Sequence, residues 1–304
     1  MLDRGQVNNS EAAAQLPRNK DGSIRKTFVK SVARRIEAAD ATGLNALVGN
    51  LHESDMGALI EALPADQRQR LVELLGIDFD FTALTEVDVK NTPRVGRKQF
   101  PSTLPLREKE LVLTFDDGPW PGTTTKILNA LKNECVRVTF FLLGRNAAAH
   151  PQIARQALAE GHSIGHHSYS HPLLDRMSMA KAEAEVDRGI AADETALYGQ
   201  VRASPATPFF RFPGFASNPA LLNRMNERGL VVFGADVWAS DWDQMAPDQE
   251  LRLILSRIES VGRGIVLFHD TKSQTAQMVP AFLRELKKRG YRIVHIVPAG
   301  GNAR

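Results

Sequence analysis

The sequence is poor in cysteine and nearly balanced in charge. Its 304 residues include one cysteine, Cys135, so no disulfide can form within the chain and its thiol content does not indicate a compartment. Cys135 directly precedes the apolar run VRVTFFLLG, where we expect a small packing residue rather than a nucleophile. The formal net charge is only +3 and the basic residues are scattered, which argues against a nucleic-acid-binding surface.

Long apolar runs are also missing. No stretch approaches the roughly 20 apolar residues that a membrane-spanning helix needs, so we expect no membrane span. The opening MLDRGQVNNS lacks the apolar centre of a signal peptide, so the chain as written starts in the cytoplasm. Cytosolic action, export without a leader and a misassigned start are all left open. Its hydrophobic content of 43% and charged content of 24% are typical of a soluble globular chain with one large domain and a smaller part.

The first third of the sequence has a helical period. Residues 1–25 are polar and aperiodic, which predicts a flexible arm. From residue 26 to residue 90 apolar residues recur at helical spacing, which predicts a small all-helical module. Residues 44–90 resemble the N-terminal helical domain of bacterial magnesium transporters, on the stretch LHESDMGALIEALPADQRQRLVELLG. That likeness rests on helix–turn–helix patterning, so plain packing helices are the preferred interpretation, and a protein partner for the module is left open.

After a Pro-rich and basic linker at 91–108, short apolar runs alternate with amphipathic segments. This β/α alternation predicts strands at LVLTF (111), VRVTFF (136), HSIGHH (162), PFFRF (208), LVVFGADV (230), GIVLFH (264) and YRIVHI (291). Seven strands with intervening helices favour a parallel (β/α)₇ barrel. A doubly wound open sheet is the alternative, although its GxGxxG turn is absent after the first strand.

Two adjacent acids end the first of these strands, in LVLTFDDGPW. An Asp-Gly-Pro turn needs only one acid, because one Asp side chain is enough to bond the local backbone. Asp116 and Asp117 would repel each other unless a cation or a shared proton lay nearby. A plain turn and a functional site both remain as interpretations of this stretch alone.

Polar residues follow four other predicted strands as well. They lie at carboxyl ends, where the βα loops of a parallel barrel meet at one mouth and catalytic groups gather. The set comprises His166, His167 and His171 after the third strand, Arg211 after the fourth, Asp241 and Trp242 after the fifth, and His269 and Asp270 after the sixth.

His167 and His171 lie four residues apart, a spacing at which two imidazoles can bind one metal ion. Ordinary loop histidines are the alternative, and an available aspartate favours the metal. Two histidines and one carboxylate suit Zn²⁺ with a bound water, or Fe²⁺, Co²⁺, Ni²⁺ or Mn²⁺. His162 and His166 are expected to be structural.

The motifs together resemble those of the polysaccharide deacetylases, the NodB-homology or carbohydrate esterase family 4 enzymes. TFDDGP (114–119), HSYSHP (167–172), RFPG (211–214), SDW (240–242) and LFH (267–269) match the five family motifs in order and spacing over residues 109–298. The resemblance implies a distorted (β/α)₇ barrel of the NodB-homology type as the catalytic domain. It also implies metal-dependent removal of acetyl groups from an acetylated glycan, usually outside the cytoplasm.

The resemblance also implies a role for each matching residue. Asp117, His167 and His171 would bind one divalent metal ion, with Zn²⁺ preferred over Co²⁺, Ni²⁺ or Mn²⁺. The remaining roles are Asp116 as general base, oriented by Arg211; His269 as general acid, paired with Asp241; Trp242 and Leu267 as walls of the acetyl pocket; and a backbone N–H near Gly214 as an oxyanion donor.

The sequence departs from the family pattern at the fourth motif. The family often reads Asp-x-x-Asp-Trp, but Trp238 stands at the leading position here. Asp236 lies two residues earlier and could face the same side of a strand as a partial substitute. Otherwise Trp238 provides an apolar wall or a sugar-stacking face.

Three functions remain in view from the sequence. The preferred one is an N-deacetylase of a glycan that contains N-acetylglucosamine, such as chitooligosaccharide or peptidoglycan. The second is a metal-dependent hydrolase of a small non-sugar amide or imide on the same barrel. The third is an inactive carbohydrate-binding or interaction protein, for which a full acid, base and ligand set has no purpose.

Overall fold

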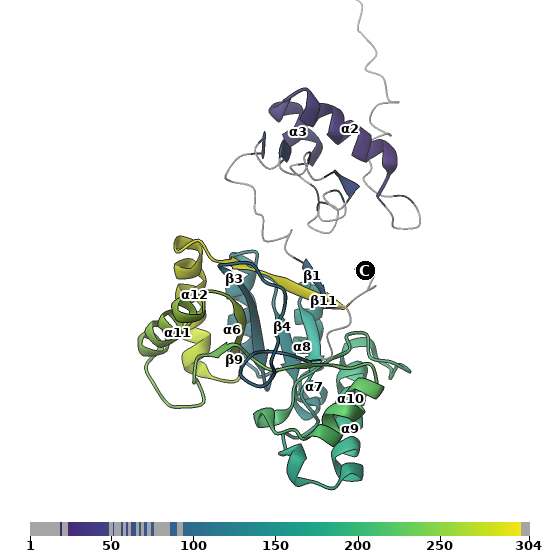
Figure 1. Cartoon of the computed structure of the whole chain (residues 1–304), viewed down its shortest axis with the longest axis vertical. Helices are drawn as coiled ribbons and strands as arrows, with labels where there is room; N and C mark the ends of the chain where they lie inside the picture. The colour runs from purple at the N-terminus through teal and green to yellow at the C-terminus, as the bar shows by residue number, and fades with distance from the viewer. Residues whose placement is uncertain are drawn as a thin grey trace, which may run out of the picture. The chain divides into compact units, whose positions relative to one another are not determined.

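The computed structural model (Figure 1) describes residues 19, 24–48, 51, 56, 59, 62–64, 67, 70–71, 74–75, 86–89 and 94–298. The chain divides into two compact units, one within residues 1–84 and one within residues 85–302. The arm expected over residues 1–25 lies almost wholly outside the described residues.

The first unit is helical where it is described. Helices α2 (Lys26–Glu37) and α3 (Ala41–Val48) each bury one face, because their apolar residues recur at three- and four-residue spacing. One apolar cluster joins both helices to later residues of the module: Phe28, Val32, Ile36, Leu44, Val48, Met56, Leu59, Leu63, Leu71 and Leu75. The predicted helical region is therefore present.

The second unit is built on a parallel sheet. Its strands lie in the order β2-β7-β6-β5-β4-β3-β9-β8, and β10 pairs with β3 beside this path. Every pairing is parallel, and β1 forms a separate parallel pair with β11. The strands are β1 (Glu86–Val89), β2 (Arg94–Val95), β3 (Glu110–Asp116), β4 (Thr139–Leu142), β5 (Ser163–His166), β6 (Phe209–Phe210), β7 (Val231–Phe233), β8 (Val237–Trp238), β9 (Gly264–His269), β10 (Arg292–Ile293) and β11 (His295–Pro298).

Helices surround this sheet and bury one face each against it (Figure 1). They are α6 (Thr123–Asn133), α7 (Gly144–Ala149), α8 (Pro151–Ala159), α9 (Met179–Tyr198), α10 (Pro219–Glu227), α11 (Pro247–Val261) and α12 (Ser273–Lys288), with short 3₁₀ turns η3 (Leu174–Arg176) and η4 (Pro213–Phe215). Helix α12 packs against both α6 and α11, whereas α9 packs against α7 and α8. This is the predicted distorted β/α barrel of the NodB-homology type.

Two predicted strands are each broken in two. The run at 230 gives β7, which lies next to the edge strand β2, and β8, which is the edge strand at the other end of the order; residues 234–236 connect them. Asp236 holds this connection, because its carboxylate accepts hydrogen bonds from the Arg97 N–H (2.9 Å), the Thr103 hydroxyl (2.6 Å) and the Ile265 N–H (2.7 Å). The run at 291 similarly gives β10 and β11.

The stretch before the barrel contributes to it from residue 94. Strand β2 pairs with β7, and Val95, Leu104 and Leu106 are buried in one cluster with Phe141. These residues lie within the segment 91–108 that the sequence suggests as a linker. Proline and basic residues alone therefore do not distinguish a linker from an edge of the sheet.

The expectation that Cys135 packs in the core is wrong. Its side chain is exposed, and its backbone has a φ of 53° in the turn between α6 and β4. The chain reverses direction there, so the side chain is left outside the apolar layer that begins at Val136. None of the helices in the described part of the chain is both long and apolar enough to span a bilayer.

Candidate active site

The two adjacent acids diverge at the end of β3. Strand β3 is buried along its whole length, and Asp116 is its last residue, opposite Phe141 of β4 and His269 of β9. Asp117 leaves the strand with a φ of 79°, a conformation that is uncommon for a residue other than glycine. The side chains of Asp116 and Asp117 therefore have different surroundings.

Asp117, His167 and His171 come together as a set of three metal-ligating side chains. The Asp117 Oδ1 atom lies 3.7 Å from His167 Nε2 and 3.5 Å from His171 Nε2. The three ligating atoms all lie within 4.8 Å of one another. Ligands of a tetrahedral metal at about 2.1 Å are about 3.4 Å apart, so these spacings suit one ion.

Asp117 and His167 also have the right chemistry to hold a cation. Asp117 Oδ1 is buried and has no hydrogen-bond donor among the described residues, which is costly for a carboxylate unless a cation faces it. His167 Nδ1 lies 2.8 Å from the carbonyl oxygen of Arg211, and a carbonyl can only accept, so Nδ1 carries the proton. The lone pair of Nε2 therefore faces Asp117.

Burial keeps His167 neutral. The imidazole is almost completely buried, and this desolvation lowers the pKa of His167 to about 3 even though the charge of Asp117 acts in the opposite direction. Metal ligation requires the neutral ring, so the pocket presents this histidine in its binding form.

The loop that carries both histidines is fixed from two sides. Its carbonyl oxygens at Ser168 and Tyr169 accept hydrogen bonds from the first N–H groups of α7, at 3.0 and 3.1 Å. The Ser170 N–H and hydroxyl donate to the carboxylate of Glu185 on α9, at 3.1 and 2.8 Å. His171 itself has a φ of 66°. The hydrogen bonds to α7 and α9 therefore hold the loop in place although the backbone of His171 is strained.

Asp116 pairs with a buried arginine on the other side of the ligand set. Its Oδ1 accepts a 2.6 Å hydrogen bond from Arg211, and its Oδ2 lies 3.8 Å from His167 Nε2. Burial raises the pKa of Asp116 above its ordinary value, and the charge of Arg211 opposes that rise. One oxygen is therefore engaged by Arg211 and the other faces the ligand set.

Arg211 is held by more than its ion pair. The side chain is completely buried, and it donates to the Thr114 hydroxyl (2.8 Å) and to the carbonyls of Phe233 (3.3 Å) and Gly234 (2.9 Å). Its guanidinium also lies 4.3 Å from the centre of the Phe141 ring. A surface ion pair is thus excluded for this residue.

A second pair, His269 and Asp241, lies on the neighbouring strand edge. His269 Nδ1 lies 2.8 Å from Asp241 Oδ1, and the backbone N–H of His269 donates to Asp241 Oδ2 at 2.6 Å. Burial alone would lower the pKa of His269, but the hydrogen bond and charge of Asp241, aided by Asp116 and Asp117, raise it to about 9. The imidazole is thus protonated near neutral pH.

Aromatic rings form one wall beside this pair. The Trp242 ring is exposed and meets the His269 ring edge to face at 6.0 Å, and Trp238 meets Trp242 at 5.8 Å. Phe215 also stacks on Trp238, with ring centres 6.1 Å apart, and the Lys98 ammonium lies 4.5 Å from the centre of the Trp238 ring. Trp238 therefore provides an aromatic wall.

Asp236 does not substitute for the missing acid of the fourth motif. Its carboxylate accepts hydrogen bonds from residues 97, 103 and 265 within the barrel. Leu267 is buried on β9 opposite Trp238. Gly214 lies in η4 with a φ of 57°, and no described contact joins it to the ligand set, so its role stays a prediction.

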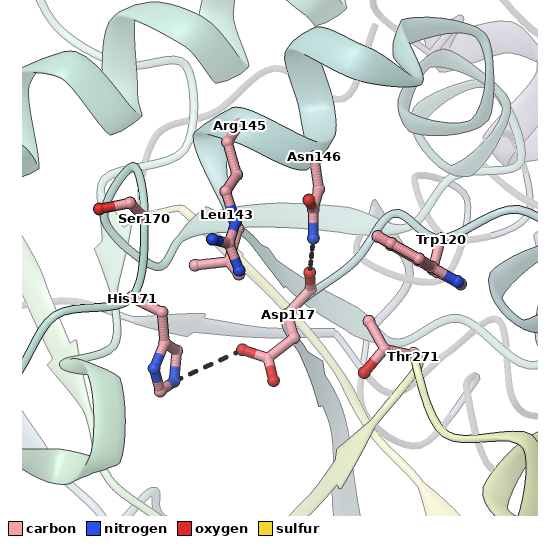
Figure 2. Close-up of a pocket in the computed structure, with 8 residues that line it drawn as sticks. All are labelled: Asp117, Trp120, Leu143, Arg145, Asn146, Ser170, His171 and Thr271. Atoms are coloured by element: carbon pink, nitrogen blue, oxygen red, sulfur yellow. Dashed lines mark hydrogen bonds and ion pairs between the residues drawn. The ribbon is translucent and has the colours of Figure 1, made fainter.

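Asp117 lines a pocket of about 580 Å³, whose lining side chains are drawn in Figure 2. His171 and Ser170 lie on one side, and Trp120 and Thr271 lie on the other. Asn146 of α7 donates to the backbone carbonyl of Asp117 at 2.7 Å, so the main chain of Asp117 is held in place as well.

Several buried polar residues around the site escape sequence reasoning. Asp270 accepts from the Thr124 hydroxyl at 2.6 Å, and burial raises its pKa to about 7. The Thr275 hydroxyl lies 2.9 Å from Asp241 Oδ2 and 2.9 Å from Glu250 Oε1. The sequence points to Asp270 only through its place beside His269. It does not distinguish Thr275 and Glu250, because both lie on helices whose buried faces also contain apolar residues.

Comparisons with known proteins agree on one family. The sequence profile described as polysaccharide deacetylase matches residues 103–233. The chain is 32% identical over 209 residues to the peptidoglycan-N-acetylglucosamine deacetylase PgdA of Listeria monocytogenes, covering 66% of this chain and 42% of that protein. The chain thus spans less than half the length of that relative.

Two further similarities cover more of the matched protein. The chain is 31% identical over 202 residues to a peptidoglycan-N-acetylglucosamine deacetylase of Bacillus cereus, covering 64% of this chain and 72% of that protein. The solved structure of a Bdellovibrio bacteriovorus peptidoglycan deacetylase superposes with a TM-score of 0.63 and 25% identity. That match covers 92% of this chain and 90% of the other, so it extends beyond the barrel.

Proposed function

This chain belongs to the polysaccharide deacetylase family, and we propose from that premise that it is a metal-dependent hydrolase that removes N-acetyl groups from a glycan containing N-acetylglucosamine. Chitooligosaccharide and peptidoglycan are the two substrate classes considered. The observation that carries the proposal is the ligand set Asp117, His167 and His171, with Asp116 on one side and the paired His269 across the adjacent strand.

The ligand set is proposed to hold one divalent ion, with Zn²⁺ preferred because two imidazoles and one carboxylate leave a tetrahedral position free. Such an ion, when bound, acidifies a water molecule and polarises the acetyl carbonyl group. Two observations support a cation here: Asp117 Oδ1 is buried without a hydrogen-bond donor among the described residues, and the His167 ring is neutral. Co²⁺, Ni²⁺ and Mn²⁺ remain alternatives for the same ligands.

Asp116 is proposed as the general base. Its Oδ2 faces the ligand set while Arg211 holds Oδ1, so the free oxygen is placed to take the proton of the attacking water. Arg211 orients this carboxylate and is itself locked by three other acceptors.

His269 is proposed as the general acid that protonates the departing amine. A donor must carry its proton at the working pH, and Asp241 raises the pKa of this imidazole to about 9 although burial acts to lower it. Nδ1 is engaged by Asp241, so Nε2 is the atom that gives the proton. Trp242 and Leu267 are proposed to wall the acetyl methyl group, and a backbone N–H near Gly214 to donate to the oxyanion that develops on the acetyl oxygen.

The test is acetate release from N-acetylglucosamine oligomers and from peptidoglycan fragments, before and after metal removal. We expect release that stops when a chelator has removed the metal and returns with Zn²⁺ or Co²⁺. Release that continues after verified metal removal would contradict the metal mechanism. Activity only on small non-sugar amides or imides, or binding of the oligomers without release, would contradict the deacetylase proposal.

A further inference from the structure

Glu250 is a buried carboxyl group behind the acid pair, and the proposed reaction does not use it. It lies in the first turns of α11, its surface is fully buried, and its Oε1 lies 2.9 Å from the Thr275 hydroxyl of α12. The same hydroxyl lies 2.9 Å from Asp241 Oδ2. Asp241 in turn contacts His269 Nδ1 at 2.8 Å, so the four side chains form a continuous hydrogen-bonded chain.

The number of protons in this chain constrains its charge. The Thr275 hydroxyl has one proton but touches two carboxyl groups, so one of the two contacts needs a proton on the carboxyl side. Asp241 already accepts from the backbone N–H and the ring of His269. Among the residues that the structure describes, Thr275 is the one donor within reach of Glu250, so the extra proton belongs on Glu250.

The surroundings of Glu250 agree with a neutral acid. Burial and, after it, the nearby charge of Asp241 raise the pKa of Glu250 to about 7. Its Oε2 has no hydrogen-bond partner and no lysine or arginine pairs with it within the described residues. Arg257 on the same helix donates instead to the Trp238 carbonyl (2.8 Å) and the Ser240 hydroxyl (2.7 Å). An ionised Glu250 would therefore be a buried charge that only the Thr275 hydroxyl and the charge of His269 offset, and these do not outweigh burial and the charge of Asp241.

We propose that Thr275 and Glu250 are positioning residues for the general acid: Glu250, held as a neutral carboxylic acid, donates to the Thr275 hydroxyl and so directs the hydroxyl proton at Asp241. Asp241 Oδ2 then accepts from the Thr275 hydroxyl as well as from the His269 N–H, and this donor from a second helix keeps the carboxylate in one orientation, which fixes His269. This inference rests on the proposed role of His269. It adds two residues from two different helices to the acid side of the site.

The test compares four variants by their effect on kcat, KM and metal content. Thr275→Val removes the donor to Asp241 and is expected to lower kcat about 10-fold, the worth of a hydrogen bond to a charged group, while Thr275→Ser keeps the hydroxyl and the rate. Glu250→Ala is expected to lower kcat in the same way, and Glu250→Gln, which still donates to Thr275, to restore it. KM and metal content should stay unchanged. Glu259→Ala, an exposed position of the same helix, is the matched control.

The double variant tests whether the two residues act as one unit. Because they act through the same carboxylate, Thr275→Val with Glu250→Ala should be no slower than the slower single variant. Multiplied losses, a Gln variant as slow as the Ala variant, or an unchanged kcat in Thr275→Val would each overturn the proposal. If Glu250→Ala does not fold, the Thr275→Val and Thr275→Ser pair decides the matter.

A readout that needs no turnover separates this proposal from the proposed function. The proton on His269 Nδ1, shared with Asp241, gives a downfield NMR signal that Thr275→Val and Glu250→Ala should shift, and that Glu250→Gln and Glu259→Ala should leave in place. A signal that stays unchanged in both Thr275→Val and Glu250→Ala overturns the positioning role. A shifted signal in a protein that releases no acetate supports the positioning role and contradicts the deacetylase function.

Discussion

At the scale of single residues, the site depends on two adjacent aspartates, Asp116 and Asp117, whose surroundings differ. Asp116 ends a buried strand and is paired with Arg211, whereas Asp117 leaves the strand at a positive φ and faces the histidines. The two aspartates have the same intrinsic chemistry, so burial and partners alone give them different proposed roles.

The two Asn substitutions are therefore expected to fail differently. Asp117→Asn replaces an anionic ligand by a neutral amide and should weaken metal binding, with activity partly recovered in excess metal. Asp116→Asn keeps the shape but cannot take a proton, so it should retain metal and lose about 10²- to 10⁴-fold in kcat. Metal content by mass spectrometry, measured beside the rate of acetate release, distinguishes the two. Metal loss in Asp116→Asn but not in Asp117→Asn would reverse the assignments.

The pH dependence of the acid side follows from the pKa of His269. This pKa is raised to about 9, so His269 is protonated below that pH and the rate should fall as the pH rises through it. Asp241→Asn removes the charge that raises the pKa, and burial then lowers it, so the alkaline limb of the kcat profile should move to lower pH. Asp243→Asn, exposed in the same loop, is the control. An alkaline limb that stays in place in Asp241→Asn would remove Asp241 from this role.

At the scale of elements, close approach between α9 and the histidine loop holds the ligands. A Cβ added at Gly189 of α9 would lie 2.5 Å from the Ser168 carbonyl carbon and 2.8 Å from the Tyr169 nitrogen. Both contacts are backbone atoms that cannot rotate away. Glycine is therefore required here, although alanine would favour the helix by about 0.5 to 1 kcal/mol.

Gly189→Ala is accordingly expected to displace the loop. We expect a loss of about 1 to 3 kcal/mol in the free energy of unfolding, from overpacking, and a weaker metal affinity because His167 and His171 move with the loop. Isothermal titration with Zn²⁺ and thermal unfolding measure the two effects. Lys181→Ala, on an exposed position of α9, should change neither. Normal metal affinity in a destabilised Gly189→Ala protein would show that the loop geometry is independent of this contact.

The elements also show how far a sequence can predict this fold. Buried strands such as β3 and β9 are predictable, because their apolar runs are continuous and their polar residues follow directly at the carboxyl ends. The break between β7 and β8 is not predictable from the sequence. The run LVVFGADV has the same apolar pattern whether it forms one strand or two strands with different neighbours. Pairing across the sheet decides such a break.

The candidate site divides in the same way. The spacing of two histidines and an available aspartate predict the ligand set, and the family resemblance implies the His269–Asp241 pair. The structure brings those residues together. The sequence suggests Asp236 as a partial substitute for the missing acid, because strand alternation predicts which face of the sheet its side chain is on. Alternation does not predict the three donors from residues 97, 103 and 265 that engage this carboxylate. Thr275 and Glu250 belong to helices without a motif, so only tertiary packing reveals them.

At the scale of the whole molecule, the two units have separate apolar clusters. The helical cluster contains residues from Phe28 to Leu75, and the barrel clusters contain residues from Val95 onward. All residues of the candidate site come from the second unit. A separate core for each unit is the property expected of independent domains.

A fragment of residues 85–304 should therefore fold alone and keep most of the kcat of the full chain on short oligomers. A fragment of residues 100–304 is its control, because it lacks β2, the Val95 carbonyl that accepts from Gly234 N–H, and the Arg97 N–H that donates to Asp236. Loss of those hydrogen bonds and of Val95 burial, roughly 3 kcal/mol together, should lower the Tm of the shorter fragment by about 6 °C or more. Thermal unfolding and acetate release of both fragments check this. Equal Tm values would show that the barrel begins after residue 100, and an insoluble or inactive 85–304 fragment would show that the helical module is part of the catalytic domain.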